Sequence, residues 1–162
     1  MKSYETRILI VEDDLDLLHL LKDYFANDFD HVISAVDGIS AYLAVAEGNP
    51  DIILTDIGMP GFSGLDLVTR LRTEGNNVPI LIASGNADRS DAVRALRLGV
   101  VDFVEKPYQL EDLRTSVFRA LEISSREHNL SQMIEKFGED SPHVKRVQRM
   151  VGLFKVANAK RA

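Results

Sequence analysis

The stretch RILIVEDD, residues 7–14, joins a continuous apolar run to three carboxylates. A short run of Ile, Leu and Val without polar alternation is typical of a parallel strand that is covered on both faces. Four later runs share this character. We therefore predict five strands, at Arg7 to Val11, His31 to Val36, Asp51 to Thr55, Pro79 to Ser84 and Val100 to Glu105.

Between these runs, apolar residues recur with the spacing of helices that bury one face. The predicted buried stripes are Leu17, Leu18, Leu21 and Phe25; Ile39, Leu43 and Ala46; Leu65, Val68 and Leu71; and Val93, Ala95 and Leu96. Gly48, Gly75 and Gly99 follow three of the stripes, where helices commonly end. Alternating strands and helices indicate an α/β fold with a doubly wound, five-stranded parallel sheet.

Length and composition restrict the class of protein. The chain has 162 residues, 45% hydrophobic and 27% charged, which fits one ordinary domain with a short appendage. Cysteine is absent, and this excludes thiolate zinc sites, iron–sulfur clusters and cysteine nucleophiles. The longest apolar runs fall far short of the roughly 20 residues of a membrane span. We expect a cytoplasmic protein with no membrane partner.

Charge is divided unevenly along the chain. Of the 19 basic residues, six lie in residues 142–162, whereas all 25 acidic residues lie in residues 1–141, so that this longer part carries a net charge of −12. A basic end can bind nucleic acid. A solvated helix face, or one that docks on an acidic neighbour, is the interpretation that we favour.

Polar side chains gather just after the predicted strands, where doubly wound sheets bind their ligands. They are Glu12, Asp13 and Asp14, then Asp56, then Ser84, and finally Glu105, Lys106 and Pro107. Crowded carboxylates repel one another unless a cation lies among them, and oxygen ligands without thiolates favour a hard ion such as Mg²⁺. Any one acid could instead cap a helix or lie in a solvated loop, and for Asp14 alone this is the favoured interpretation.

These residues resemble the receiver (response regulator) domains of bacterial two-component signalling. The resemblance covers residues 6–122 and rests on four motifs in order: Ile8 to Asp14, the stretch DIGMPG at residues 56–61 with Gly64, then Ser84, and FVEKP at residues 103–107. It implies a flavodoxin-like sheet with strand order 2-1-3-4-5, residues 1–122 as the receiver domain, and a signalling domain rather than an enzyme.

The resemblance also implies a role for each site residue. Asp56 would accept a phosphoryl group from a phosphohistidine of a sensor histidine kinase or phosphotransfer protein. Glu12 and Asp13 would hold Mg²⁺ together with Asp56 and the backbone carbonyl of Gly58, and Lys106 would contact a phosphoryl oxygen.

A switch is implied by two further residues. Ser84 would donate a hydrogen bond to the phosphoryl group, and Phe103 would turn inward as the Ser84 loop shifts, so that the output face, roughly residues 89–121, changes. The peptide bond before Pro107 is often cis in this family. Gly58 offers no side chain to screen the phosphoryl group from water, which leaves the lifetime of the phosphorylated state open.

Residues 123–162 are predicted to form a helical extension, a candidate dimerisation element. A helix starting near Gln109 runs through Leu121, and a second stripe follows at Leu130, Ile134 and Phe137. Gly138 breaks this helix, and Ser141 and Pro142 start a last one with a stripe at Val144, Val147, Val151 and Phe154. Residues 137–147 resemble the segment that opens the ATPase module of sigma-N-dependent (NtrC-type) activators, although the chain has no phosphate-binding loop. We expect a homodimer.

Two other functions fit parts of the pattern. Haloacid-dehalogenase-type phosphatases also use a Mg²⁺-bound Asp, but they need a second Asp two residues later, where this chain has Gly58. The alternative is a phosphorylation-independent protein- or DNA-binding module with a vestigial acidic site. We do not expect direct nucleic-acid binding, because no recognisable helix-turn-helix follows the receiver.

Overall fold

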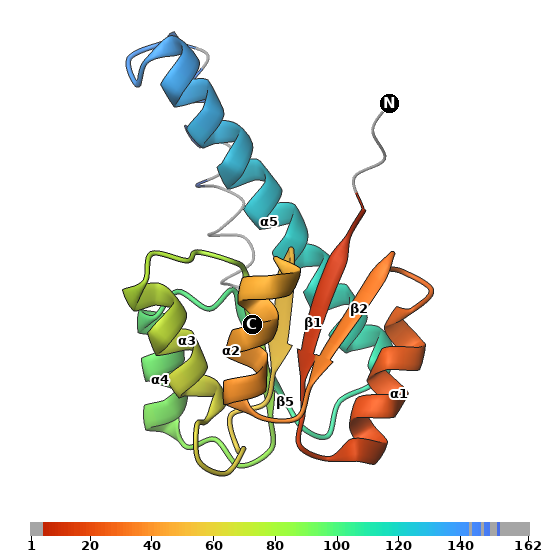
Figure 1. Ribbon diagram of the computed structural model, residues 1–162. Helices are drawn as coiled ribbons and strands as arrows, with labels where there is room; N and C mark the ends of the chain where they lie inside the picture. Colours follow the sequence, from red (N-terminus) through yellow and green to blue (C-terminus); the bar gives the residue numbers. More distant parts are fainter. Residues whose placement is uncertain (1–4, 143, 147, 150–151, 153–162) are drawn as a thin grey trace. The chain divides into compact units, whose positions relative to one another are not determined.

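The computed structural model describes residues 5–142, 144–146, 148–149 and 152, and strands alternate with helices up to residue 137 (Figure 1). The strands are β1 (Arg7–Val11), β2 (His31–Ala35), β3 (Ile52–Thr55), β4 (Ile80–Ser84) and β5 (Asp102–Glu105). The helices are α1 (Leu15–Phe25), α2 (Gly38–Gly48), α3 (Gly64–Thr73), α4 (Arg89–Arg97) and α5 (Leu110–Phe137).

The strands form one parallel sheet in the order β2-β1-β3-β4-β5. Figure 1 shows α2 in front of this sheet and the first part of α5, up to residue 120, behind it. The predicted doubly wound α/β fold, with its strand order, is therefore confirmed. Four of the five strands are one or two residues shorter than their apolar runs.

Burial explains why the apolar runs marked the strands so clearly. Every residue of β3 and β4 is buried, and so are four of the five residues of β1. These three strands lie in the middle of the sheet, where helices cover both faces. The edge strands β2 and β5 are mostly half-buried.

Two of the predicted helix stripes are correct. Leu18, Leu21 and Phe25 of α1 are buried and Leu17 is half-buried, and the three stripe residues of α3 are buried. In α2 the prediction is wrong, because Ile39 and Leu43 are 63% and 54% exposed.

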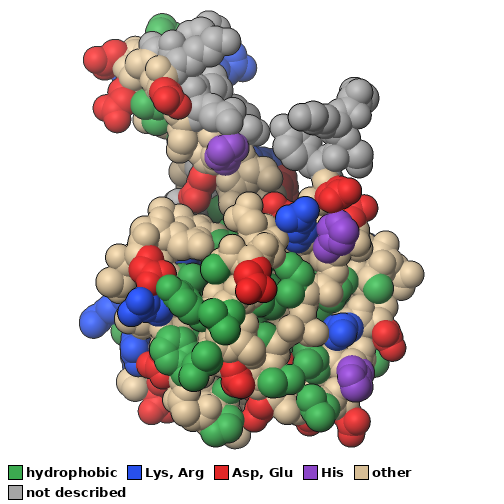
Figure 2. Space-filling model, viewed as in Figure 1, with side chains coloured by type: hydrophobic (Ala, Val, Ile, Leu, Met, Phe, Trp, Pro, Cys, Tyr) green, Lys and Arg blue, Asp and Glu red, His purple; other side chains and the backbone are tan. Residues whose placement is uncertain are grey.

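Helix α2 instead buries the face that carries its smaller residues. Gly38, Ala41 and Val45 face the core, and a Cβ at Gly38 would lie 2.3 Å from the carbonyl oxygen of Phe62. The helix therefore packs closely through small residues and turns its larger ones to solvent, on a face where hydrophobic side chains gather in Figure 2. Apolar residues on both faces make the stripe ambiguous.

Helix α4 departs from the prediction in the same way. Ala95 is fully buried, but Val93 and Leu96 are 39% and 64% exposed. The consequence is a helix that is anchored through one small residue and presents apolar side chains outward.

Helix ends follow the predicted glycines in two cases of three. Gly75 and Gly99 have φ angles of 77° and 71°, in the left-handed region that favours glycine. Gly48 is instead the last residue of α2, and Asn49 after it takes the left-handed conformation, with φ at 42°. Asparagine tolerates this region better than most residues.

The chain divides into two compact units, residues 1–120 and 121–162. Helix α5 ends at Phe137, and Gly138 follows with φ at 79°. Pro142 is helical, and the carbonyl of Ser141 accepts a hydrogen bond from the Lys145 amide at 3.0 Å. The predicted stripe residues Val147, Val151 and Phe154 lie outside the described residues. None of the described helices is long and apolar enough to cross a bilayer.

Candidate functional site

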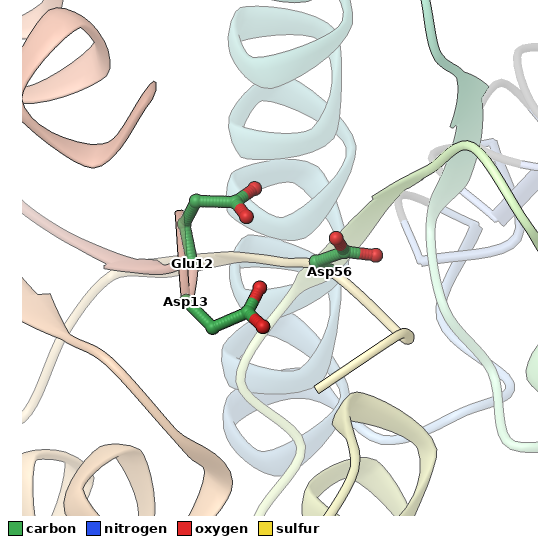
Figure 3. A group of neighbouring side chains, drawn as sticks. All are labelled: Glu12, Asp13 and Asp56. Atoms are coloured by element: carbon green, nitrogen blue, oxygen red, sulfur yellow. The ribbon is translucent and has the colours of Figure 1, made fainter. Parts of the chain in front are cut away.

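Three carboxylates converge at the carboxyl ends of neighbouring strands. Glu12 and Asp13 follow β1, Asp56 follows β3, and these strands pair in parallel. One oxygen of each carboxylate lies within 4.8 Å of those of the other two. Figure 3 shows the carboxyl groups of Glu12 and Asp13 on the side of their segment that faces Asp56.

A lysine joins this cluster from the far edge of the sheet. Lys106 follows β5, and its Nζ donates to Glu12 Oε2 at 2.8 Å and to Asp56 Oδ2 at 2.9 Å. Glu12 is only 4% exposed, whereas Asp13 is exposed. The ion pair of Glu12 and Lys106 thus lies on the inner side of the site, and Asp13 lies on its solvent-exposed side.

The surroundings keep Asp56 ionised. Burial by itself would raise the pKa of the Asp56 carboxyl, but hydrogen bonds from Lys106 and from the Gly58 amide outweigh it, and the pKa is lowered. The Gly58 amide donates to Asp56 Oδ1 at 3.0 Å. The Ser84 hydroxyl acts in the same direction as the smallest contribution.

Glu12 behaves differently because burial dominates. Burial raises the pKa of this carboxyl although Lys106 opposes it. Lys106 loses solvation too, but its two carboxylate partners outweigh this loss and raise its pKa. The lysine is therefore a firmly protonated point charge between two acids.

The backbone that carries Asp56 is held by Gly64. A Cβ at Gly64 would lie 1.9 Å from the carbonyl oxygen of Asp56, so the first turn of α3 can approach only because the side chain is absent. The Thr55 hydroxyl donates to the same carbonyl at 2.9 Å. In the sequence, Gly64 was only part of a motif, and this close approach gave no signal there.

The predicted switch residues come from β4 and β5. Ser84 ends β4, is 2% exposed and pairs in register with Glu105. Phe103 is half-buried and packs against the main core cluster. The Lys106–Pro107 peptide bond is cis. Ser84 and Phe103 therefore lie on two paired strands, β4 and β5, on the side of the sheet that also carries Lys106.

Two further polar residues, Asp14 and Tyr108, follow the same strands but do not belong to the carboxylate cluster. Asp14 caps α1, because its side chain accepts hydrogen bonds from the amides of Asp16 and Leu17 at 3.0 and 3.1 Å. The Tyr108 hydroxyl is buried without a hydrogen-bond partner among the described residues, and burial raises its pKa. Nothing in the spacing of the sequence marked Tyr108.

The donor set fits a hard divalent ion. All three side chains offer carboxylate oxygens, close enough to share one ion, and Mg²⁺ is commonly held by one or two carboxylates with water completing its coordination. Glu12, Asp13 and Asp56 are the residues that could hold it.

The chain matches the family model of the response regulator receiver domain over residues 8–118. Together with the parallel sheet and the acidic cluster, this match defines a phosphorylation-controlled signalling domain of two-component systems, not a conventional enzyme. The chain belongs to the response regulator receiver family.

Relatives and solved structures agree with this assignment. The two-component response regulator PhoP of Pseudomonas aeruginosa is 38% identical over 120 residues, which cover 74% of this chain and 53% of PhoP. The transcriptional regulatory protein KdpE of Staphylococcus aureus is 29% identical over 130 residues, 80% of this chain and 55% of KdpE. This chain thus spans about half the length of these relatives.

The receiver fold is also matched in three dimensions. The crystal structure of the signal receiver domain of a putative LuxO repressor protein from Vibrio parahaemolyticus superposes with a TM-score of 0.72 at 27% identity. The match covers 76% of this chain and 95% of that domain.

Proposed function

We propose that Asp56 accepts the phosphoryl group, from a phosphohistidine of a sensor histidine kinase or phosphotransfer protein. The observation that carries the proposal is a carboxylate with a lowered pKa, fixed by the Gly58 amide and Lys106 beside two further acids. An oxygen of Asp56 attacks phosphorus, the phosphorus–nitrogen bond breaks, and the imidazole keeps the electron pair.

Glu12, Asp13, Asp56 and the backbone carbonyl of Gly58 would hold Mg²⁺. When bound, Mg²⁺ neutralises the negative charge that would otherwise keep the carboxylate and the phosphoryl group apart. The exposed Asp13 lies on the open side of the cluster, where a phosphoryl donor can enter.

Lys106 holds Asp56 in place before transfer and is available to the product. Its Nζ already contacts Asp56 Oδ2, so a phosphoryl group attached to Asp56 brings anionic oxygens into its reach. Because lysine acts as a point charge, it needs no bidentate geometry for this contact. The same residues would assist later hydrolysis, and Gly58 leaves that reaction without a side-chain screen.

Ser84 and Phe103 would report the phosphorylated state. A phosphoryl group adds about −1.5 to −2 charge and three acceptor oxygens, and the buried Ser84 hydroxyl is the donor that turns towards it. The half-buried Phe103 then moves further inward, and α4, β5 and α5 carry the change to a partner.

The test is phosphorylation by acetyl phosphate with Mg²⁺, followed by intact mass. Wild type should gain one phosphoryl group, and Asp56→Asn should gain none. Asp14→Asn is the matched control, because it lies in the same acidic stretch and asparagine caps a helix as well as aspartate. Full labelling of Asp56→Asn would refute the assignment.

We also propose how the whole protein is organised. Residues 1–122 would be the receiver and residues 123–162 an extension through which two copies dimerise in the cytoplasm. The chain would be the regulatory part of a longer transcription regulator, such as an NtrC-type activator. A change of elution volume between unphosphorylated and phosphorylated protein tests a coupled dimer, and identical volumes would remove it.

A further inference from the structure

Helix α4 turns a set of arginines to solvent. Arg89, Arg94 and Arg97 are exposed and, with Ser90 and Val93, line an open hollow on the surface. Helical geometry places these five residues on one side of α4, opposite the buried Ala95. We call this side the α4 arginine face. Figure 2 shows basic side chains gathered at the left margin, where Figure 1 places α3 and α4.

The charges of this face are poorly neutralised. Arg89 and Arg97 have no ion pair or side-chain hydrogen bond within the part of the chain that the structure describes. Arg94 donates to the neutral Thr69 hydroxyl at 3.1 Å and reaches the Asp66 carboxylate only at 3.9 Å. By contrast, Arg114 pairs with Asp28 at 2.7 Å and Arg70 with Glu74 at 2.6 Å. A cationic face on an acidic domain points to an anionic partner.

The same helix also exposes aliphatic surface. Val93 lies within the α4 arginine face, and Leu96, 64% exposed, lies beside it. Aliphatic surface next to cations suits a protein segment that carries both acids and apolar residues. The nucleic-acid backbone offers phosphates but no aliphatic side chains to cover Val93 and Leu96.

We propose that the α4 arginine face binds an acidic, amphipathic segment of a partner protein. Acidic side chains of the segment pair with Arg89, Arg94 and Arg97, and apolar side chains cover Val93 and Leu96. The inference deepens the proposed function, because α4 belongs to the output face there, and it names the chemistry of the partner that this face would take.

The probe is a fluorescent synthetic helical peptide with Glu at its polar positions and Leu at its apolar positions. Fluorescence anisotropy measures its binding to the full chain. We expect binding that weakens as salt rises, and Arg89→Glu with Arg97→Glu should weaken it about tenfold. Leu96→Ser should weaken it as well. Lys22→Glu on α1 is the charge-reversal control for Arg89→Glu alone, with the same change in net charge, and should leave the binding unchanged.

Three results would overturn the proposal: no binding of the acidic peptide, equal binding by the double reversal, or tighter binding of duplex DNA at the same arginines. The same peptide with Lys in place of Glu should not compete with the acidic peptide for the α4 arginine face. All substituted residues except Lys22 are exposed, so urea midpoints near the wild-type value will show that the variants fold.

The outcome is separable from that of the proposed function. If the double reversal no longer binds the peptide but is still labelled at Asp56 by acetyl phosphate, both the α4 arginine face as the peptide site and Asp56 as the phosphoacceptor are supported. If Asp56→Asn is fully labelled while the arginine variants still lose the peptide, the phosphoacceptor is wrong and the α4 arginine face stands.

Discussion

Replacing Gly64 by alanine should displace the backbone that carries Asp56. A Cβ at this position would lie 1.9 Å from the Asp56 carbonyl oxygen, 2.9 Å from its carbon and 3.1 Å from Thr55 Oγ1. Carbon and oxygen that are not bonded approach to about 3.3 Å, so the two backbone segments must separate by more than about 1 Å. Such overpacking costs about 1–3 kcal/mol of unfolding free energy.

Urea unfolding and acetyl phosphate labelling measure the two consequences. Gly64→Ala should lose about 1–3 kcal/mol and should be labelled more slowly, because Asp56 moves relative to Lys106. Gly58→Ala is the matched stability control in the same loop, since its Cβ would meet only Asp56 Oδ1 at an ordinary 3.8 Å. Wild-type stability and labelling rate in Gly64→Ala would show that the Asp56 backbone does not depend on the missing side chain at Gly64.

Three other substitutions test separate contacts by urea unfolding. Lys106→Met leaves the buried Glu12 without its cation and should lower the unfolding free energy by about 1–3 kcal/mol at neutral pH. This loss should shrink on acidification, because the pKa of Glu12 is raised and only its ionised form is destabilising. A loss that does not change with pH would contradict this. Asp28→Asn should destabilise the protein at neutral pH, since the hydrogen bond from Arg114 lowers the pKa of Asp28. This stabilisation exists above the ordinary pKa of about 3.9 and disappears as pH falls through the lower native value. A difference in unfolding free energy between wild type and variant that persists in strong acid would contradict this. Asn49→Ala should cost about 1 kcal/mol because of its left-handed φ, while Asn49→Gly should cost nothing.

The sheet and its order of elements could be predicted because burial decides them. In β1, β3 and β4 nearly every side chain is buried, so continuous Ile, Leu and Val runs reveal the strands. Helix α2 could not be oriented in this way. It carries apolar residues on both sides, and the choice depends on how closely Gly38 approaches Phe62 in three dimensions.

The acidic cluster was accessible from sequence for a similar reason. Parallel strands end at one edge of the sheet, so carboxylates after β1 and β3 must lie close together. Lys106 follows β5 at the same edge, so its approach to the cluster was accessible too. The close approach of Gly64 and the buried hydroxyl of Tyr108 were not. They depend on distances between segments that no spacing along the chain encodes.

Chemical trapping of the phosphorylated residue identifies the phosphoacceptor directly. Borohydride reduces an aspartyl acyl phosphate to homoserine, and peptide mapping then locates the converted residue. After phosphorylation with acetyl phosphate and Mg²⁺, we expect homoserine at position 56 and at no other aspartate. Homoserine at Asp13 or another carboxylate, with Asp56 intact, would contradict this expectation.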